Sequence, residues 1–564
     1  MIGIGVSTGI CSGHIFKYEK KTIVVEKVSV TDTKLELERF NTNLDISEKQ
    51  IQEIMINSNA EIAQIFEAHL EILRDPEMKS SIEGIITDEV INAEYAVKQV
   101  IDGYVTMFEA IEDEYIRERA ADLKDIAERI LNNLLGNSDV DLKAINEPTI
   151  FLAHDLTPSE TAQLNKKYVL GFITEIGGKT SHSAIMARTL EIPAIVGIGD
   201  VFPTLETGDF VIMNGETGEF IINPDDQTVA SFEEKKLALE LERDIWNQFK
   251  NKESITASGE HIEIAANIGS AEDLDAVLSK GAEGIGLFRT EFLYMGKSDF
   301  PDEATQLGVY KAVLERMGDK PVVIRTLDIG GDKELDYFDM PKELNPFLGN
   351  RAIRLCLGHK DMFKVQLRAL LKSSIYGNLH IMLPMIATVD ELREAKELIR
   401  EVENELKIEK IEVADYKLGI MLEIPAAVFA ANILAKEVDF FSIGTNDLIQ
   451  YTFAADRMND NVSYLYQPYN PSLLNMIDFV SKAAHKAGIW VGMCGEMCSE
   501  VNAIPLLIGL GLDELSMNAS SILKTRYMMS KINKKDAKAL LDRALECENQ
   551  AQVLALTEEY LGGL

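Results

Sequence analysis

The sequence predicts a multidomain α/β protein in which a C-terminal (β/α)8 TIM barrel follows a small α/β domain with an inserted helical bundle. At 564 residues the chain is too long for a single hydrophobic core. From residue 262 onwards, apolar runs alternate with helical segments, which is typical of repeated strand–helix units. Earlier in the chain, a glycine-poor stretch of helical period lies between two strand-like segments, and this indicates an insertion.

Eight apolar runs rich in β-branched residues predict the strands of the barrel. Strands that are buried on both faces are expected to be continuously apolar, and these runs mostly are. Catalytic groups of such barrels lie where the strands end and the loops begin. The runs are residues 262–268, 284–293, 321–329, 379–386, 417–425, 438–447, 490–496 and 514–518.

The first half of the chain contains segments with two different hydrophobic patterns. Residues 1–20 and 144–228 alternate short apolar runs with turns, so we predict that they form one small α/β domain. Residues 21–143 are predicted to be the inserted helical bundle, and the barrel is predicted to occupy 257–564. A charged amphipathic stretch over 229–256 predicts a linker helix between them. Within the bundle, the apolar period predicts helices from Thr33 onwards and over 59–73, 78–111 and 113–135.

Composition and charge indicate the cellular compartment and exclude some classes of partner. The net charge is −36, which repels phosphate backbones and anionic lipid, so neither nucleic acid nor membrane is an expected partner. No apolar run reaches the roughly 18 residues of a membrane span, and no signal sequence is recognisable at the start. The five cysteines are too scattered for a disulfide framework. We therefore expect a cytoplasmic protein.

Charged and polar residues follow the predicted strands, and they predict a functional rim. Arginines bind phosphate and carboxylate through two hydrogen bonds, so several of them indicate a small ligand with more than one anionic group. Glu423 and Asp447 follow neighbouring strands, and carboxylates beside such arginines are typical of a bridging Mg²⁺. The other polar residues of the rim and its loops are Asn267, Arg289, Arg325, Arg351, Asn446, Arg457 and Cys494.

Two single residues each leave two interpretations open. Cys494 ends the seventh strand, where it is either an inert buried thiol or a group that transfers a proton. His182 lies in the segment GGKTSHSAIMAR, in the first turn of a predicted helix capped by Thr180 or Ser181. There it is either a capping histidine or a neutral nucleophile whose phosphoryl group would meet free backbone N–H donors.

Long motifs resemble the phosphoenolpyruvate-utilising enzymes. GGKTSHSAIMARTLEIPAIVG is similar to the phosphohistidine segment of that family. GLFRTEFL, RTLDIGGDKE, NPFLGNRAIR, FFSIGTNDLIQYT and GMCGE resemble its barrel motifs. The helical segments AHLEIL and DEYIRERAADLKDI resemble the enzyme I branch, the phosphoenolpyruvate–protein phosphotransferases of the bacterial sugar phosphotransferase system. The resemblance covers essentially the whole chain.

The resemblance implies a reaction and a role for each site residue. Phosphoenolpyruvate would bind the barrel with Mg²⁺, and His182 would carry its phosphoryl group to the phosphocarrier protein HPr while pyruvate is released. By motif position, Glu423 and Asp447 would hold Mg²⁺ and Cys494 would protonate the enolate. The substrate would be held by Arg289, Arg325, Arg351, Asn446, Asp447 and Arg457. The HPr-binding face would include Glu61, His69, Glu77 and Arg119. A homodimer through the barrel is also implied.

Two other functions are compatible with parts of these motifs. A pyruvate phosphate dikinase or phosphoenolpyruvate synthase shares the histidine segment and the barrel, but it needs a nucleotide-binding domain for which this sequence has no glycine-rich phosphate loop. A regulatory adaptor would use the bundle alone and have an inactive barrel. One departure from the family pattern is Lys179, where many relatives have arginine.

Overall fold

The computed structural model describes most of the chain as two compact units, Met1–Glu240 and Leu241–Leu564. The described residues are 1–564 without 8, 19–22, 57–59, 110–113, 137–144, 158–159, 161–163, 165–166, 179–180, 182, 185–186, 188–191, 296, 298, 332, 334, 336, 339, 342 and 458.

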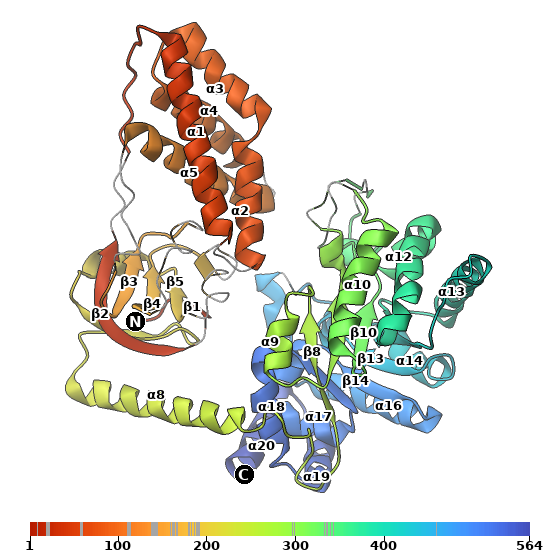
Figure 1. Ribbon diagram of the computed structural model, residues 1–564. Helices are drawn as coiled ribbons and strands as arrows, with labels where there is room; N and C mark the ends of the chain where they lie inside the picture. The colour runs from red at the N-terminus through yellow and green to blue at the C-terminus, as the bar shows by residue number, and fades with distance from the viewer. Residues whose placement is uncertain are drawn as a thin grey trace. The chain divides into compact units, whose positions relative to one another are not determined.

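A closed barrel of parallel strands forms the centre of the second unit (Figure 1). Each strand pairs with the next in the chain, and the last pairs with the first, with Glu514 opposite Glu263. The prediction of a (β/α)8 barrel is confirmed. The strands are β8 (Glu263–Ile268), β9 (Gly284–Arg289), β10 (Pro321–Arg325), β11 (Asn378–Leu383), β12 (Lys417–Leu422), β13 (Phe440–Ile443), β14 (Trp490–Met493) and β15 (Glu514–Met517).

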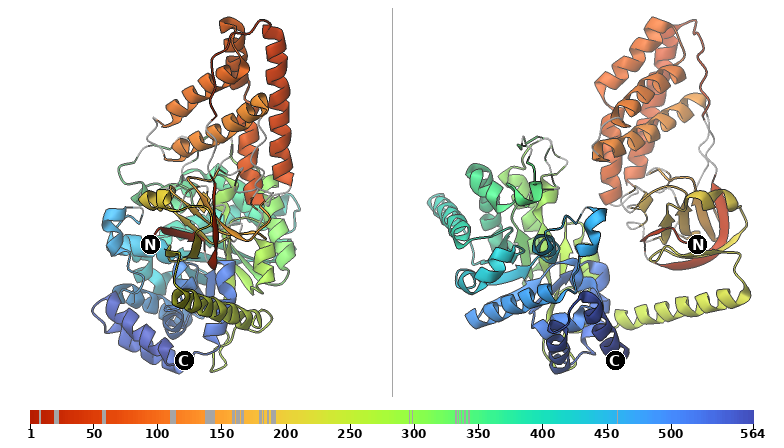
Figure 2. Two further views of the ribbon diagram at one scale, coloured as in Figure 1. Left: turned by 90° about the vertical axis from the view of Figure 1, so that its left-hand side faces the viewer. Right: turned by 180° about the vertical axis from the view of Figure 1, so that it is seen from behind.

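Helices surround the barrel because each presents one apolar stripe to the strands (Figure 1 and Figure 2). Helix α13 shows the pattern: Thr388 and Glu391 form a capping box at its start, and every third or fourth side chain from Leu392 to Leu406 is buried. The larger helices are α10 (Glu303–Met317), α12 (Lys360–Ser373), α13 (Val389–Ile408), α14 (Pro425–Leu434), α15 (Thr445–Phe453), α16 (Pro471–Ala487), α18 (Ile522–Met529), α19 (Lys534–Leu545) and α20 (Gln550–Gly562).

The barrel interior contains a second, smaller apolar cluster. Val323, Met382, Met421 and Phe440 pack there with Cys494, and the ring of Phe440 stacks on Trp490 with centroids 4.5 Å apart. The apolar side chains of this cluster come mainly from β10 to β13. Leu287 of β9 and Trp490 of β14 also contact this cluster, but Gly286, Gly492 and the carboxyl of Glu514 lie together beside it, so one sector of the interior is partly polar.

A seven-stranded sheet forms the small domain of the first unit, in the order β1-β5-β4-β3-β2-β6-β7. Strand β2 pairs with β3 in parallel, Ile15 opposite Ile150, although the bundle lies between them in the chain. This pairing confirms that the bundle is inserted into an α/β domain. The strands are β1 (Ile4–Ser7), β2 (Ile10–Tyr18), β3 (Thr149–Ala153), β4 (Val169–Thr174), β5 (Ala194–Val196), β6 (Phe210–Asn214) and β7 (Phe220–Ile222).

The bundle helices lie side by side and enclose one apolar core (Figure 1). The single helix predicted over 78–111 is wrong, because the chain breaks it at Val90, which has φ 56°. There the Asn92 side chain accepts a hydrogen bond from the Val28 backbone, which ties the break to a distant segment. The bundle helices are α1 (Thr33–Ile56), α2 (Ala60–Leu73), α3 (Pro76–Glu89), α4 (Ala93–Glu109) and α5 (Glu114–Leu135).

The predicted linker is one long helix, α8 (Asp226–Asn247), which Figure 2 shows without interruption. The segment that follows is held firmly within the second unit. The buried Arg526 guanidinium donates to the carbonyls of Phe249 and Lys250 at 3.1 and 3.2 Å and to that of Gly281 at 2.6 Å. No helix in the described part of the chain is both long and apolar enough to span a membrane.

Candidate active site

A network of buried charges lies at the ends of the barrel strands. Arg325 ends β10, and its guanidinium binds two carboxylates, Glu291 at 2.7 Å and Asp328 at 2.9 Å. Its side chain is only 7% exposed, so both carboxylates hold it in one orientation away from bulk water. A buried arginine with two partners retains its charge, and it presents a fixed cation at the rim.

Asp328 joins Arg325, at the end of β10, to Arg351 of a later loop. Its second oxygen accepts from Arg351 Nη2 at 2.9 Å, and Lys333 Nζ lies 3.3 Å from the oxygen that Arg325 uses. Burial alone would raise the pKa of Asp328, but Arg325, Lys333 and Arg351 outweigh it and hold the pKa well below its ordinary value. Asp328 is therefore an anion that positions three cations.

Arg351 connects this network to the next part of the rim. Its Nη1 donates to Asp447 at 3.2 Å and to the Tyr451 hydroxyl at 3.3 Å. The hydroxyl in turn donates to the Phe347 carbonyl at 2.5 Å. Because Arg351 is 1% exposed and shares its fork between Asp328 and Asp447, it joins the loop after β10 to helix α15.

Glu423 and Asp447 form a pair of carboxylates from neighbouring strand ends. Glu423 follows β12 and accepts a hydrogen bond from the Met385 backbone at 2.6 Å, while Asp447 lies in the first turn of α15. Burial raises the pKa of Glu423 to about 8, and the like charges of Asp447 and Asp328 add to the rise. Gly444 leaves room for the carboxylate, because a Cβ there would lie 3.0 Å from Glu423 Oε2.

This carboxylate pair fits a hard divalent cation. Both groups offer oxygen ligands, and a cation between them would offset the like charge that raises the pKa of Glu423. The described residues contain no group of three or more His, Cys, Asp or Glu side chains that could hold a metal.

Three further predicted substrate residues have looser surroundings. Arg289 ends β9 opposite Arg325 in the strand register and is half-buried, and no described residue pairs with its guanidinium. Asn446 accepts a hydrogen bond from the Tyr466 hydroxyl at 3.0 Å. Arg457 is half-buried and acts electrostatically on the same tyrosine, whose pKa burial raises to about 12. The rim thus combines two arginines that ion pairs hold in place, Arg325 and Arg351, with Arg289, whose guanidinium no described residue pairs with.

Cys494 lies below the charged network, inside the barrel. It is 5% exposed, and its Sγ lies 3.8 Å from the Ile443 carbonyl. Burial raises the pKa of the thiol to about 11, although the Ser442 hydroxyl and Arg325 act in the opposite direction. The thiol is therefore protonated at neutral pH, which a proton donor requires.

Four residues of this network were not among the predicted site residues. Glu291, Asp328 and Tyr451 contact the predicted arginines directly, and Lys333 pairs with the two acids. The acids follow the strand-ending arginines directly in the motifs RTEFL and RTLDIGGDK. This spacing was the available signal, since a buried arginine needs a nearby carboxylate.

His182 lies outside the described residues, and the described residues before and after it form a turn. The Ser181 hydroxyl accepts from the Ala184 backbone at 3.3 Å and donates to the Gly178 carbonyl at 2.9 Å. Gly177 has φ 119°, a conformation that glycine adopts without strain. Near this turn, His154 is exposed and lies 2.7 Å from Glu175. The turn is therefore built from glycine and serine.

The predicted partner-binding residues of the bundle differ in accessibility. His69 is 1% exposed and lies between Asp122 at 3.1 Å and Asp125 at 3.6 Å, where it joins α2 to α5. Glu77 is exposed in the first turn of α3. The side chains of Glu61 and Arg119 lie outside the described part of the chain. A protein partner could therefore touch Glu77 directly but His69 only through its neighbours.

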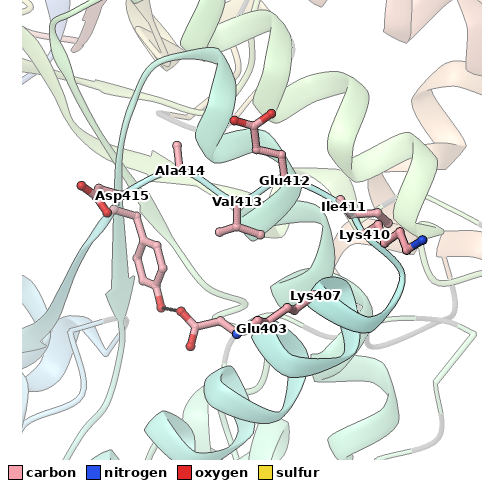
Figure 3. A pocket seen from close by; sticks show the side chains of 9 residues that line it. Glu403, Lys407, Lys410, Ile411, Glu412, Val413, Ala414 and Asp415 are labelled. Carbon is pink, nitrogen blue, oxygen red and sulfur yellow. Dashed lines mark hydrogen bonds between the residues drawn. The ribbon is translucent and has the colours of Figure 1, made fainter.

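A surface hollow lies away from the rim, before the start of β12 (Figure 3). It is lined by the end of α13 and the chain up to Tyr416, whose hydroxyl donates to Glu403 at 2.8 Å. Because strand β12 begins here, the hollow is at the opposite end of the strand from Glu423, and it contributes no group to the rim.

Comparison with known proteins agrees with the motifs. The chain matches the family models described as PEP-utilising enzyme, N-terminal, over 2–119, mobile domain, over 145–218, and PEP-binding domain, over 243–534. It is 51% identical to the phosphoenolpyruvate-protein phosphotransferase of Priestia megaterium, over 98% of this chain and 97% of that protein. Identity to the protein of the same name from Staphylococcus carnosus (strain TM300) is 50%, over 99% and 98%. A solution structure described as Enzyme I (nEIt) is 40% identical, covering 42% of this chain and 99% of its own, with a TM-score of 0.38.

Proposed function

This chain belongs to the phosphoenolpyruvate-utilising enzymes, as a phosphoenolpyruvate-protein phosphotransferase, and we propose that His182 carries the phosphoryl group from substrate to HPr. A nitrogen of the imidazole attacks the phosphorus, the bond from phosphorus to the enol oxygen breaks, and the enolate remains in the barrel. The observation that supports this most strongly is the buried arginine network beside the Glu423–Asp447 pair.

The rim arginines suit the two anionic groups of phosphoenolpyruvate. Arg325 and Arg351 are already oriented by Asp328, so binding costs little side-chain entropy. Arg289 has a free fork among the described residues and would bind phosphate or carboxylate directly. Asn446, Asp447 and Arg457 complete the proposed substrate-binding set.

Glu423 and Asp447 would hold Mg²⁺. When bound, this ion supplies positive charge that offsets the charge of the phosphoryl oxygens and the enolate. The two carboxylates provide its protein oxygens, and Arg351 orients Asp447 through its Oδ1. Chelation is expected to abolish turnover, and Mg²⁺ is expected to restore it.

Cys494 is the proposed proton donor to the enolate. Its S–H bond breaks, the proton passes to the terminal enolate carbon, and pyruvate leaves with a thiolate remaining on the enzyme. Because burial raises the pKa of the thiol to about 11, the thiol keeps its proton until a strong carbon base is generated beside it.

We also propose a cytoplasmic homodimer that associates through the barrel unit. Phe429 and Ile433 of α14 are 74% and 55% exposed, and Phe479 of the adjacent α16 is 39% exposed. An apolar surface of this kind marks a protein interface more often than a free surface. Phe429→Glu is expected to shift the protein towards monomer in analytical ultracentrifugation, and an unchanged dimer would place the interface elsewhere.

The central proposal is tested by incubation with radiolabelled phosphoenolpyruvate and Mg²⁺, followed by assay for an acid-labile label. His182→Ala is expected to abolish the label, whereas His154→Ala, which removes an exposed histidine of the same domain, is expected to retain it. Transfer of the label to added HPr would identify the acceptor. Labelling from ATP would instead favour the dikinase, and absence of any label would favour the adaptor.

A further inference from the structure

Two carboxyl groups inside the barrel, those of the buried Glu514 and the half-buried Glu263, have no role in the mechanism described so far. Glu263 begins β8 and Glu514 begins β15, and the two residues lie opposite each other in the strand register. One oxygen of each, Oε1, makes no hydrogen bond among the described residues. Glu514 is 3% exposed, so this is not a surface pair. An unpaired buried carboxyl is costly unless it has a function.

Glycines on two other strands show where the Glu514 carboxyl lies. A Cβ at Gly286 would be 2.4 Å from its Oε1, and a Cβ at Gly492 would be 3.0 Å away. Gly286 belongs to β9 and Gly492 to β14, which are separated around the barrel by β15 and β8. Only a side chain inside the barrel can reach both, so Glu514 points into its interior.

The strand register also shows which residues lie between Glu514 and the Cys494 thiol. Gly492 lies opposite Glu514 on one side and opposite Ser442 of β13 on the other, so no side chain of β14 separates them. Cys494 comes two residues after Gly492, directly after the end of β14. Ser442 is buried, and its hydroxyl acts on the Cys494 thiol as a hydrogen-bond donor that lowers the pKa of the thiol.

Two further hydrogen bonds hold this side of the barrel together. Ser516 donates to Asn267 Oδ1 at 2.6 Å, and Asn267 Nδ2 donates to the Cys494 carbonyl at 3.1 Å. They join β15, β8 and the end of β14 at the level of the thiol. The polar sector thus extends from the floor of the barrel to Cys494.

The carboxyl pair holds at least one proton at neutral pH. Burial raises the pKa of Glu514 well above its ordinary value, with Glu263 as the like charge beside it. Burial raises the pKa of Glu263 to about 7, where Glu283 adds to the rise and His261 opposes it. Glu514 in turn raises the pKa of the Cys494 and Cys498 thiols. None of these groups is a lysine or an arginine.

We propose that Glu514 returns a proton to Cys494 after each turnover, with Glu263 as the entry point from solvent at the floor of the barrel. This inference rests on the proposed role of Cys494. The Cys494 thiolate takes the hydroxyl proton of Ser442, which takes the carboxyl proton of Glu514. The Glu514 carboxylate then takes a proton from Glu263, and Glu263 takes one from water. One solvent proton enters for each pyruvate formed.

The rim acids are committed to other roles, because Glu423, whose pKa burial raises to about 8, and Asp447 are the proposed ligands of Mg²⁺. Asp328 is held as an anion by three cations. The thiolate is itself a strong base in a site that is 5% exposed. A protonated acid on the other side of the thiol, away from substrate, provides the proton without opening the rim to water.

The test compares one turnover with many turnovers. Glu514→Gln keeps the size of the side chain but removes the exchangeable acid. The first label on His182 from excess enzyme is expected at close to the wild-type rate, because Cys494 begins protonated. The steady-state rate of pyruvate formation with HPr present is expected to fall about 10-fold or more. Glu263→Gln is expected to give a smaller loss of the same kind.

The pH profile adds a readout that a structural role would not move. In the wild type, the steady-state rate is expected to fall relative to the single-turnover rate above about pH 7, as Glu263 loses its proton. In Glu514→Gln the ratio of the steady-state rate to the single-turnover rate is expected to be low and independent of pH. His380→Gln, which removes a buried titratable group from the apolar side of the interior, is the matched control and leaves the ratio unchanged.

Several outcomes would overturn the inference. A wild-type steady-state rate in Glu514→Gln would show that the thiol is reloaded elsewhere, and equal loss of both rates would show a structural role. Adding Glu514→Gln to Cys494→Ala is expected to cause no further loss, so a further loss would also contradict the relay. A wild-type steady-state rate in Cys494→Ala itself would instead remove Cys494 from the proposed function.

Discussion

Asp328 at the rim and Glu514 inside the barrel are two buried carboxyl groups with opposite surroundings. Three cations surround Asp328, with Arg325 and Arg351 both at 2.9 Å, whereas the charged group beside Glu514 is another carboxyl. The pKa of Asp328 therefore lies below its ordinary value and that of Glu514 above it. Burial is common to both, so the neighbouring charges decide whether a barrel carboxyl serves as an anion or as an acid.

The rim and the polar sector of the barrel interior also differ in the interactions that fix their side chains. At the rim, arginine forks with two or more partners fix the geometry, so loss of one member leaves the others buried and unpaired. In the interior, glycines make room for the carboxyl and few bonds hold it. The rim is therefore expected to be sensitive to substitution, and the interior sector is expected to tolerate neutral isosteres.

The largest effect is expected for Asp328→Ala. It leaves two buried guanidinium groups without their shared anion, so the barrel unit should lose about 3–5 kcal/mol of unfolding free energy. Urea unfolding followed by Trp490 fluorescence measures this loss. Glu394→Gln removes one partner of an exposed pair with Lys360 and should cost far less, because water screens that pair. Similar losses in the two variants would contradict the contrast.

An intermediate effect is expected for Arg289→Ala, and it should appear in binding rather than in stability. Because no described residue pairs with this guanidinium, the melting temperature should be unchanged. Loss of a charge-assisted bond to substrate should raise KM for phosphoenolpyruvate about 10- to 100-fold. Arg400→Ala, on the exposed face of α13, is the control with no expected change. A lower melting temperature with normal KM would make Arg289 a structural residue.

The smallest effect is expected at His380, in the apolar sector of the interior. Burial lowers its pKa to about 4, with Lys417 adding to the fall. The unfolded chain takes up the proton near pH 6.5, so stability from this group is present above that pH and is lost as pH falls towards 4. The expected loss is about 1 kcal/mol per pH unit over that window. His380→Gln should lack this slope, and an equal slope in both proteins would contradict the assignment.

Prediction from sequence worked best where burial restricts which residue types a position can carry. The eight barrel strands were found because strands buried on both faces must be apolar throughout, and Arg325 and Glu423 stood out because charge at their ends is costly. The break at Val90 was missed because neither glycine nor proline marks it, and the contact that favours it comes from Val28. Glu514 was read as part of an apolar strand, because no local pattern distinguishes a residue facing the barrel interior.

The order of strands, the insertion of the bundle and the positions of the rim arginines followed from the amino-acid sequence by itself, since these depend on local periodicity and on residue type at strand ends. Which carboxyl pairs with which cation was decided only by the closed barrel. Closure brings Asp328 against Arg351, and it leaves Glu514 facing Glu263 without a cation. Electrostatic interactions depend on distance in space rather than along the chain, so the charge state of each acid is a property of the tertiary structure.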